Sequence, residues 1–133
     1  MPRNDDIARI RATLLAAAEA ISPFTPGAVE FERKEERGDP LTAADLAADE
    51  VLRAMLPVPG EGWLSEESVD DNSRMVSERV WIVDPIDGTR EFVEGVPEWC
   101  ISIGLLEKGV PVAGGILNPV TNELVIGSLE TGV

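Results

Sequence analysis

The chain has 133 residues and a formal net charge of −14, and this negative field excludes nucleic acid and anionic membrane as expected partners. It contains no histidine and one cysteine, which excludes Ser-His-Asp and Cys-His catalysis and leaves no imidazole to bind zinc. With no signal-peptide start, no membrane-length apolar run and no second cysteine for a disulfide, we expect a cytoplasmic protein of one domain over residues 1–133.

The first predicted helix covers residues 4–22, where apolar residues recur at three- and four-residue spacing. Asn4 is its candidate N-cap, and Pro23 and Pro26 end it. The residues expected on its buried face are Ile7, Ile10, Leu14, Ala18 and Ile21. Residues 28–33 then alternate between small or apolar and charged side chains, which predicts a half-exposed strand, and a charged loop follows over residues 34–40.

A second predicted helix covers residues 43–56 and ends before the run Pro-Val-Pro-Gly at residues 57–60. Thr42 and Asp45 have the spacing of a capping box, with Asp in place of the usual Glu. We expect four apolar side chains of this helix to be buried: Leu46, Val51, Leu52 and Met55. A short strand over residues 61–65 then leads into an acidic loop that extends to Asp71.

The remaining elements predict a sheet. Residues 81–83 form a short buried strand that we expect to stop at Asp84 and Pro85, and a short helix over residues 89–93 begins at Thr89. Residues 100–106, 110–117 and 123–128 predict three further strands, joined by turn residues that favour antiparallel pairing. Two helices followed by an antiparallel sheet indicate an α+β layered fold.

Acidic residues occur at the ends of predicted elements, where side chains often converge on a site. Asp84 and Asp87 flank a proline and an isoleucine, Glu66 follows a predicted strand, and Asp45 lies further upstream. Carboxylate oxygens of this kind are the ligands that Mg²⁺ prefers. Each residue also has a simpler interpretation on its own, since Asp87 with Gly88 is a common turn, Glu66 a solvated loop residue and Asp45 part of a helix cap.

Gly88 and Thr89 add the features of a phosphate site. A glycine permits close approach of the backbone to a ligand, and the free N–H groups at the start of the helix over residues 89–93 would point at an anion. The net charge of the chain would repel phosphate unless bound cations invert the local sign. Carboxylates that hold metal beside a helix start therefore predict a site for a phosphate ester.

Three segments together resemble the inositol monophosphatase family. Residues 81–92, Trp-Ile-Val-Asp-Pro-Ile-Asp-Gly-Thr-Arg-Glu-Phe, closely resemble its signature. Residues 64–68, Leu-Ser-Glu-Glu-Ser, match its upstream acidic motif, and residues 39–45, Asp-Pro-Leu-Thr-Ala-Ala-Asp, match the segment at the start of its second helix. The resemblance implies a Mg²⁺-dependent phosphomonoesterase with a layered α/β sandwich of the inositol monophosphatase and fructose-1,6-bisphosphatase type, in which N-terminal helices pack on an antiparallel sheet.

The resemblance also implies a metal site, with two or three Mg²⁺ ions when the site is complete. The implied ligands are the side chains of Glu66, Asp84 and Asp87 and the backbone carbonyl of Ile86. Asp84 would bridge two metals, and Asp87 would also border the substrate. Two-metal chemistry would then activate a water and neutralise the leaving oxygen in an in-line displacement.

Catalytic and substrate roles follow from the same resemblance. Thr89, oriented by Asp45, would position and deprotonate the attacking water, and Glu66 would hold that water's metal. Gly88 and Thr89 would bind phosphate through their backbone N–H groups. Lys34, by itself a solvated loop charge, lies where the family has a lysine near the site.

The substrate is a finer prediction. Thr-Arg-Glu-Phe at residues 89–92 resembles the 3'(2'),5'-bisphosphate nucleotidase branch, so we expect hydrolysis of 3'-phosphoadenosine 5'-phosphate to AMP and phosphate. An inositol-1-monophosphatase or a fructose-1,6-bisphosphatase-like activity is an alternative. A non-catalytic fragment or module that retains part of the metal site is another.

The length of the chain departs from the family pattern. Family members have a second α/β half, which carries another metal-binding aspartate in a Trp-Asp motif that residues 1–133 lack. We therefore interpret the chain as a truncated N-terminal half whose own activity is open. An exposed sheet edge would favour self-association, so we include a homodimer as a candidate assembly.

Overall fold

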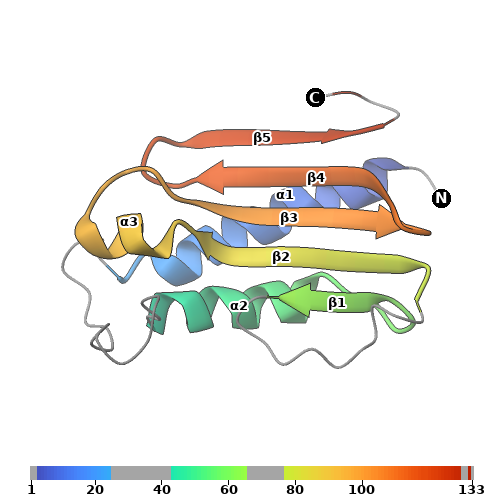
Figure 1. The fold of residues 1–133 in the computed structure, drawn as a ribbon, viewed down its shortest axis with the longest axis horizontal. Helices are drawn as coiled ribbons and strands as arrows, with labels where there is room; N and C mark the ends of the chain where they lie inside the picture. Colours follow the sequence, from blue (N-terminus) through green and yellow to red (C-terminus); the bar gives the residue numbers. More distant parts are fainter. Residues whose placement is uncertain (1–2, 25–42, 66–76, 130–131, 133) are drawn as a thin grey trace.

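The structure is a computed structural model of the chain, and it describes residues 3–24, 43–65, 77–129 and 132. Within these residues, two long helices share a core with one face of a five-stranded sheet (Figure 1). The helices are α1 (Arg3–Ile21), α2 (Ala43–Met55) and the short α3 (Thr89–Glu94). The strands are β1 (Gly62–Ser65), β2 (Arg79–Asp87), β3 (Cys100–Glu107), β4 (Val110–Asn118) and β5 (Glu123–Ser128). This arrangement confirms the predicted α+β layered fold.

The sheet has the strand order β1-β2-β3-β4-β5, so neighbours in sequence are neighbours in space (Figure 1). Antiparallel pairing is confirmed from β2 to β5. The pair of β1 and β2 is parallel, which differs from the antiparallel sheet expected from the sequence. A parallel pair needs a long connection instead of a hairpin turn, and residues 66–78 supply that length.

Helix α1 packs against the sheet through the face that its spacing predicts. Ile10 and Leu14 are fully buried, and Ile21 is nearly so. A Cβ at Gly115 of β4 would lie 2.8 Å from Ile10 Cγ2 and 3.1 Å from Leu14 Cδ1, so this glycine lets the helix approach the strand. The helix begins at Arg3, and Asn4 therefore lies inside its first turn instead of capping it.

Helix α2 buries a different face from the one predicted. Leu52 is fully buried as expected, but Leu46 is 51% exposed and Met55 is 39% exposed. The other buried positions are Ala44 and Ala48, which lie one turn apart along the helix, and Asp45, which is next to Ala44. Small side chains let α2 lie close to the rest of the core, and this contact outweighs the burial of the larger apolar residues. The predicted cap residue Thr42 lies outside the described residues.

Strand β2 is longer than predicted, and this difference positions the candidate site. It continues through Asp84 and Pro85 as far as Asp87, with an irregular register against β3 between Asp84 and Asp87. Proline lacks an N–H for the strand ladder and is tolerated where such a bulge interrupts the pairing. The strand predicted over residues 28–33 lies outside the described part of the chain.

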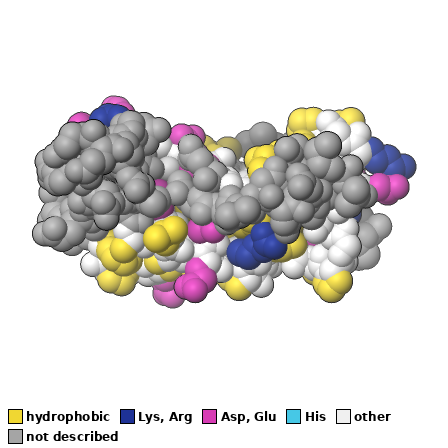
Figure 2. Space-filling view, turned by 60° about the horizontal axis from the view of Figure 1, so that its bottom comes forward, with side chains coloured by type: hydrophobic (Ala, Val, Ile, Leu, Met, Phe, Trp, Pro, Cys, Tyr) yellow, Lys and Arg dark blue, Asp and Glu magenta, His cyan; other side chains and the backbone are white. Residues whose placement is uncertain are grey.

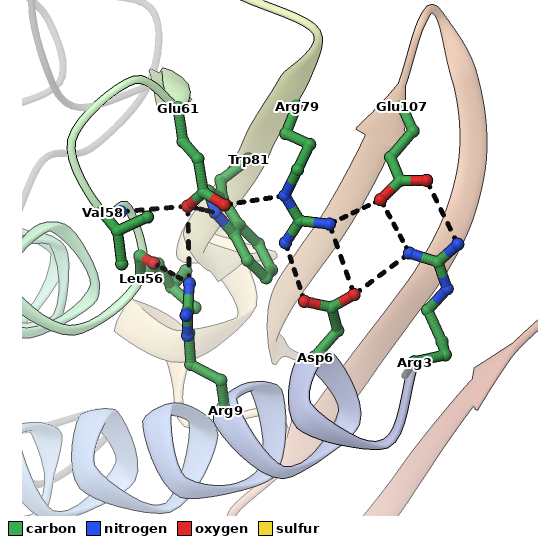
Figure 3. A network of polar contacts seen from close by, with 9 residues as sticks. All are labelled: Arg3, Asp6, Arg9, Leu56, Val58, Glu61, Arg79, Trp81 and Glu107. Atoms are coloured by element: carbon green, nitrogen blue, oxygen red, sulfur yellow. Dashed lines mark hydrogen bonds and ion pairs between the residues drawn. The ribbon is translucent and has the colours of Figure 1, made fainter. Parts of the chain in front are cut away.

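The start of β2 is held by a network of charged side chains from α1 and β3 (Figure 3). Arg79 donates to Asp6 at 2.7 Å and to Glu107 at 2.5 Å. Arg3 donates to the same two carboxylates, at 3.0 Å to Asp6 and at 2.8 Å to Glu107. Hydrogen bonding from Arg3 lowers the pKa of Glu107 to about 2, with Arg79 adding to the effect, and bonding to Asp6 raises the pKa of Arg79. The network therefore joins α1, β2 and β3 at the end of β2 opposite Asp84 and Asp87.

Glu61, directly before β1, extends this network (Figure 3). Its carboxylate accepts hydrogen bonds from Arg79 Nε at 2.7 Å, Trp81 Nε1 at 2.8 Å and the Val58 N–H at 2.9 Å. Burial of Glu61 opposes ionisation, but these hydrogen bonds outweigh it and lower the pKa of the carboxyl group. The first residues of β1 and β2 are thereby tied together.

The surface of the described residues carries apolar side chains in several places. In the view of Figure 2 these side chains form separate groups, with acidic side chains among them. On the sheet, Ile82, Ile116 and Val125 are exposed, whereas their strand neighbours Trp81, Val83 and Leu117 face the helices and are buried. None of the helices among the described residues is long and apolar enough to cross a membrane.

Candidate active site

The last residues of β2 place Asp84 and Asp87 on one face of the sheet. Asp84 pairs with Ser102 and Asp87 with Cys100, so three steps along β2 match two steps along β3. Residues two apart on a regular strand share a face, and the extra residue of the bulge therefore aligns the two aspartates. Ile101, between Ser102 and Cys100, is fully buried against the helices. The two carboxylates consequently lie on the face of the sheet opposite the helix-covered core.

Cys100 is the pairing partner of Asp87 on β3. Its thiol is half-buried, and burial raises its pKa. The charges of Asp87 and then Asp84 raise this pKa further. Sequence reasoning gave Cys100 no role at the site, because its pairing partner on β2 lies far back along the chain.

Gly88 forms the corner between β2 and α3. Its φ of +99° lies in the left-handed region, and it occupies the N-cap position of α3. A Cβ at this position would lie 2.9 Å from the Glu98 carbonyl oxygen and 3.2 Å from Trp99 Cβ, so a larger residue does not fit. The geometry therefore requires glycine for the turn after Asp87, whereas the predicted close approach of its backbone to a phosphate stays a prediction.

Helix α3 is anchored by an aromatic pair. Phe92 is fully buried, and its ring meets that of Trp99 edge to face with the ring centroids 4.9 Å apart. The Phe92 N–H donates to the Gly88 carbonyl at 2.9 Å, and Gly95, with φ +81°, ends the helix. Packing of the aromatic pair therefore holds the backbone of Gly88 and Thr89 directly after Asp87.

Two cavities border the aspartates. Asp84 lines one of about 390 Å³ together with Ser65 of β1 and Ser102 of β3. Asp87 lines another of about 640 Å³, which also contains Cys100. Other residues that line the larger cavity include Gly88, Glu91, Trp99 and Asn118. Sequence reasoning had assigned no role at the site to most of these lining residues.

The structure describes only some of the remaining predicted site residues. Asp45 lies in the first turn of α2 and is fully buried. Thr89 is the first residue of α3, but its side chain is not described, so the expected contact between Asp45 and Thr89 stays a prediction. Glu66 and Lys34 fall outside the described residues.

The donor chemistry of the described residues fits a hard cation. Among them, no group of three or more Asp, Glu, Cys or His side chains surrounds one point. Asp84 and Asp87 supply two carboxylates on a common face of the sheet. The third predicted carboxylate, Glu66, lies outside the described residues. An oxygen-rich set of this kind suits Mg²⁺, which commonly retains waters and binds through few carboxylates.

Comparisons with known proteins match this chain to one family of phosphatases. The model of the inositol monophosphatase family matches residues 4–133. A histidinol-phosphatase from Mycobacterium tuberculosis is 48% identical over 82 residues, which cover 60% of this chain and 31% of the relative. The 3'(2'),5'-bisphosphate nucleotidase CysQ of Salmonella typhimurium is 40% identical over 112 residues, which cover 78% of this chain and 44% of the relative.

Solved structures agree with the sequence relatives. An inositol monophosphatase from Zymomonas mobilis superposes with a TM-score of 0.78 at 33% identity, over 96% of this chain and 49% of that protein. The chain thus spans about half the length of this protein and less than half of the two sequence relatives. With the fold, the DPIDGT motif on its bulged strand and the family match in agreement, the chain belongs to the inositol monophosphatase family.

Proposed function

We propose that this chain forms the metal- and phosphate-binding part of a Mg²⁺-dependent phosphomonoesterase. The observation that carries the proposal is the bulge in β2, which aligns Asp84 and Asp87 on one face directly before the left-handed Gly88. The family match over residues 4–133 supports a phosphatase of this class. Carboxylates for cations and a close backbone turn for an anion therefore occur side by side in the chain.

The proposed ligands for two or three Mg²⁺ ions are the side chains of Glu66, Asp84 and Asp87 and the carbonyl of Ile86. Two features support them: the oxygen-only donor set, and the common face on which the register of β2 and β3 places Asp84 and Asp87. The Ile86 side chain is buried in the core, which anchors the backbone between the two aspartates. When bound, Mg²⁺ would supply the positive charge that lowers the pKa of a water and neutralises a leaving oxygen.

The chain's own residues have the remaining roles. Gly88 and Thr89 are proposed to donate backbone N–H groups to the phosphate, because the corner at Gly88 turns the chain at that point. Asp45 is proposed to orient the Thr89 hydroxyl, which would position and deprotonate the attacking water, and Glu66 would hold the metal for that water. Lys34 is proposed to lie near the phosphate, where its charge would partly offset the carboxylates.

For the substrate we propose a 3'(2'),5'-bisphosphate nucleotide, with 3'-phosphoadenosine 5'-phosphate hydrolysed to AMP and phosphate. The run Arg90-Glu91-Phe92 and the 40% identity to a bisphosphate nucleotidase over 78% of the chain support this choice. Phe92 acts in the core instead of at the substrate, whereas Arg90 is exposed and Glu91 lines the larger cavity. Any substrate contact of this run therefore falls to Arg90 and Glu91.

Other members of the same class are the competing substrates. Inositol 1-phosphate is favoured by the structural likeness to an inositol monophosphatase, and histidinol phosphate by the 48% identity over 82 residues. A fructose-1,6-bisphosphatase-like activity and a non-catalytic module that keeps part of the metal site complete the alternatives.

Phosphate release separates these possibilities. The purified chain is incubated with each substrate in the presence of Mg²⁺, and parallel samples contain a chelator in excess. We expect release from 3'-phosphoadenosine 5'-phosphate at least about tenfold faster than from the other substrates, a difference of about 1.4 kcal/mol in transition-state binding. Faster release from inositol 1-phosphate or histidinol phosphate would reassign the substrate. Binding of Mg²⁺ without any release would favour the non-catalytic module.

A further inference from the structure

A row of side chains crosses four strands at the end of the sheet beside α3 (Figure 1). Asp87 of β2 pairs with Cys100 of β3, and Asn118 of β4 pairs with Glu123 of β5. The register of β3 with β4 brings Cys100 next to Asn118 and so links the two pairs. Directly opposite residues of paired strands point to the same face of a sheet. The row therefore extends from a proposed metal ligand, Asp87, to Glu123.

This row lies on the face of the sheet opposite the helices. Ile101 and Leu117, which are next to the row on β3 and β4, are buried in the core that the sheet shares with the helices. Successive side chains of a strand point to opposite faces, so the row points away from that core. Neighbouring strands lie about 4.8 Å apart, and the three steps from Asp87 to Glu123 therefore span about 14 Å. A nucleotide can bridge such a distance between its phosphate and its base, whereas inositol 1-phosphate is shorter.

The same row lines the larger cavity of the candidate site. This cavity of about 640 Å³ has Asp87 and Gly88 on its wall, and it also has Glu123. Glu91 and Glu98 line it too, and none of the described residues that line it is basic. An ionised carboxylate accepts hydrogen bonds and cannot donate them. The cavity therefore favours an organic group that carries hydrogen-bond donors, and it disfavours a second phosphate.

The carboxylate of Glu123 is oriented by the hairpin between β4 and β5. Thr121 Oγ1 donates to Glu123 Oε1 at 2.8 Å. Asn118 fixes the turn, because its Oδ1 accepts from the backbone N–H groups of Val120 at 2.9 Å and Thr121 at 3.3 Å. Its Nδ2 also donates to the Pro97 carbonyl oxygen at 3.0 Å. One oxygen of the Glu123 carboxylate is thus engaged within the hairpin, and among the described residues none donates to the other.

We propose that this cavity receives the base of the nucleotide substrate and that Glu123 is a specificity-determining residue, whose carboxylate accepts a hydrogen bond from the exocyclic amino group of adenine. The inference rests on the proposed function and deepens it. Ile116 also lines the cavity and is 42% exposed, so it offers an apolar surface to the base. With the 3'-phosphate at Asp87 and Gly88, the second phosphate lies outside the cavity, away from its carboxylates.

The test compares 3'-phosphoadenosine 5'-phosphate with an analogue in which hydrogen replaces the exocyclic amino group. Affinities are measured by calorimetric titration of the full chain with each nucleotide in the presence of Mg²⁺, and kcat/KM is measured where phosphate is released. We expect the wild type to favour the adenine nucleotide by about tenfold, the size typical of a hydrogen bond to a charged group. Where phosphate is released, the preference is expected in KM, because the bond is present before and during the reaction.

Two variants of Glu123 and a matched control assign this preference to one side chain. Glu123→Ala removes the acceptor and is expected to reduce the preference to less than about twofold, by weakening the binding of the adenine nucleotide alone. Glu123→Gln keeps an acceptor oxygen without the charge, and we expect a preference of about threefold. Glu94→Ala removes the same charge from an exposed position of α3 that does not line the cavity, and it is expected to keep the preference of the wild type. Glu123 is itself exposed, so we expect its variants to keep the fold, which urea unfolding checks.

The outcomes for the base pocket and for the proposed function are distinguishable. Equal binding of the two nucleotides by the wild type, or a preference that survives in Glu123→Ala, overturns the pocket, whereas hydrolysis of the adenine nucleotide in the same experiment keeps the proposed function. If inositol 1-phosphate is hydrolysed but neither nucleotide binds or reacts, the nucleotide substrate is overturned together with the pocket. Binding of none of these phosphate esters overturns both the pocket and the proposed phosphate site.

Discussion

Gly88 sets the geometry of the corner between β2 and α3. Two effects act against a side chain at this position: the left-handed φ of +99° and the contact of 2.9 Å that a Cβ would make with the Glu98 carbonyl oxygen. Gly60 has a similar φ of +95°, but a Cβ there would meet nothing within 4 Å. Comparison of the same substitution at the two glycines therefore separates the cost of backbone strain from the cost of steric overlap.

Substitution of both glycines tests this reading of the corner. We expect Gly60→Ala to lower the free energy of unfolding by about 1 kcal/mol, the strain of a left-handed alanine. We expect Gly88→Ala to cost about 2–3 kcal/mol, because the overlap with backbone atoms is added to that strain. Urea unfolding followed by tryptophan fluorescence measures both. Equal costs for the two variants would show that the Glu98 carbonyl does not crowd position 88.

Single residues were the most predictable part of the site. Asp84, Asp87 and Gly88 were identified because their types and spacing are specific to one motif, and the structure places them together. Their alignment through a bulge was not predictable, since it depends on pairing with Cys100 and Ser102 of the next strand. The roles of all the predicted site residues stay predictions, and for Glu66, Lys34 and the Thr89 side chain the structure gives no description of position either.

Among the elements, α2 shows how packing overrides the size of apolar side chains. Periodicity located the helix and the buried Leu52 correctly, but it assigned Leu46 and Met55 to the core, where the structure has Ala44 and Ala48. A sequence shows that a helix has an apolar side, but when both sides carry apolar residues only tertiary contacts select the buried one. Here the contacts with α1 and β2 select the side that is rich in alanine.

The two leucines of α2 provide a direct check of this orientation. Leu52→Ala removes a fully buried side chain, and we expect a loss of about 3 kcal/mol in the free energy of unfolding. Leu46→Ala removes a side chain that is 51% exposed and is expected to change stability by no more than about 0.5 kcal/mol. Both values come from chemical denaturation. The opposite ranking of the two variants would mean that the helix is rotated relative to the sheet.

The charged network at the start of β2 makes the stability of the folded chain depend on pH. The pKa of Glu107 is about 2 in the folded chain, against a usual value of 4.5. A lowered pKa favours the folded state above pH 4.5, and this contribution is lost as the pH falls toward 2. Glu107 is partly exposed, so solvent screening reduces the size of the effect.

Replacement of Glu107 by glutamine removes this titration. We expect Glu107→Gln to be less stable than the wild type at pH 6, and the difference to shrink as the pH is lowered from 4.5 to 2. Urea midpoints at a series of pH values measure it. A difference between the two proteins that stays constant over this range would show that Arg3 and Arg79 do not hold the ionised carboxylate.

At the scale of the whole molecule, the fold class and family were predicted from the sequence, and the sheet topology only in part. Turn residues identified the antiparallel pairing of β3 with β4 and of β4 with β5, because each of these two connections is short and local. The parallel pairing of β1 with β2 was missed, because it depends on the long connection over residues 66–78 and on packing against α2. This parallel pair gives Ser65 its place beside Val83.

The face of the sheet opposite the helices carries both exposed apolar side chains and the two aspartates. Ile82, Ile116 and Val125 are exposed on the face that carries Asp84 and Asp87. The chain also spans only about half the length of a structurally similar family member. Turnover therefore stays a proposal for this chain, as does the homodimer, whereas metal binding by Asp84 and Asp87 is testable on the 133 residues themselves.

Calorimetric titration with Mg²⁺ of the wild type, Asp84→Asn and Asp5→Asn tests the central claim most directly. Asp5 is an exposed aspartate in the first turn of α1, so its variant removes the same charge far from the proposed site in the sequence. We predict saturable binding by the wild type and Asp5→Asn, and at least about a hundredfold weaker binding by Asp84→Asn, with all three proteins folded. Equal binding by Asp84→Asn and the wild type, or no binding by any of them, would contradict the assignment of a Mg²⁺ site at the end of β2.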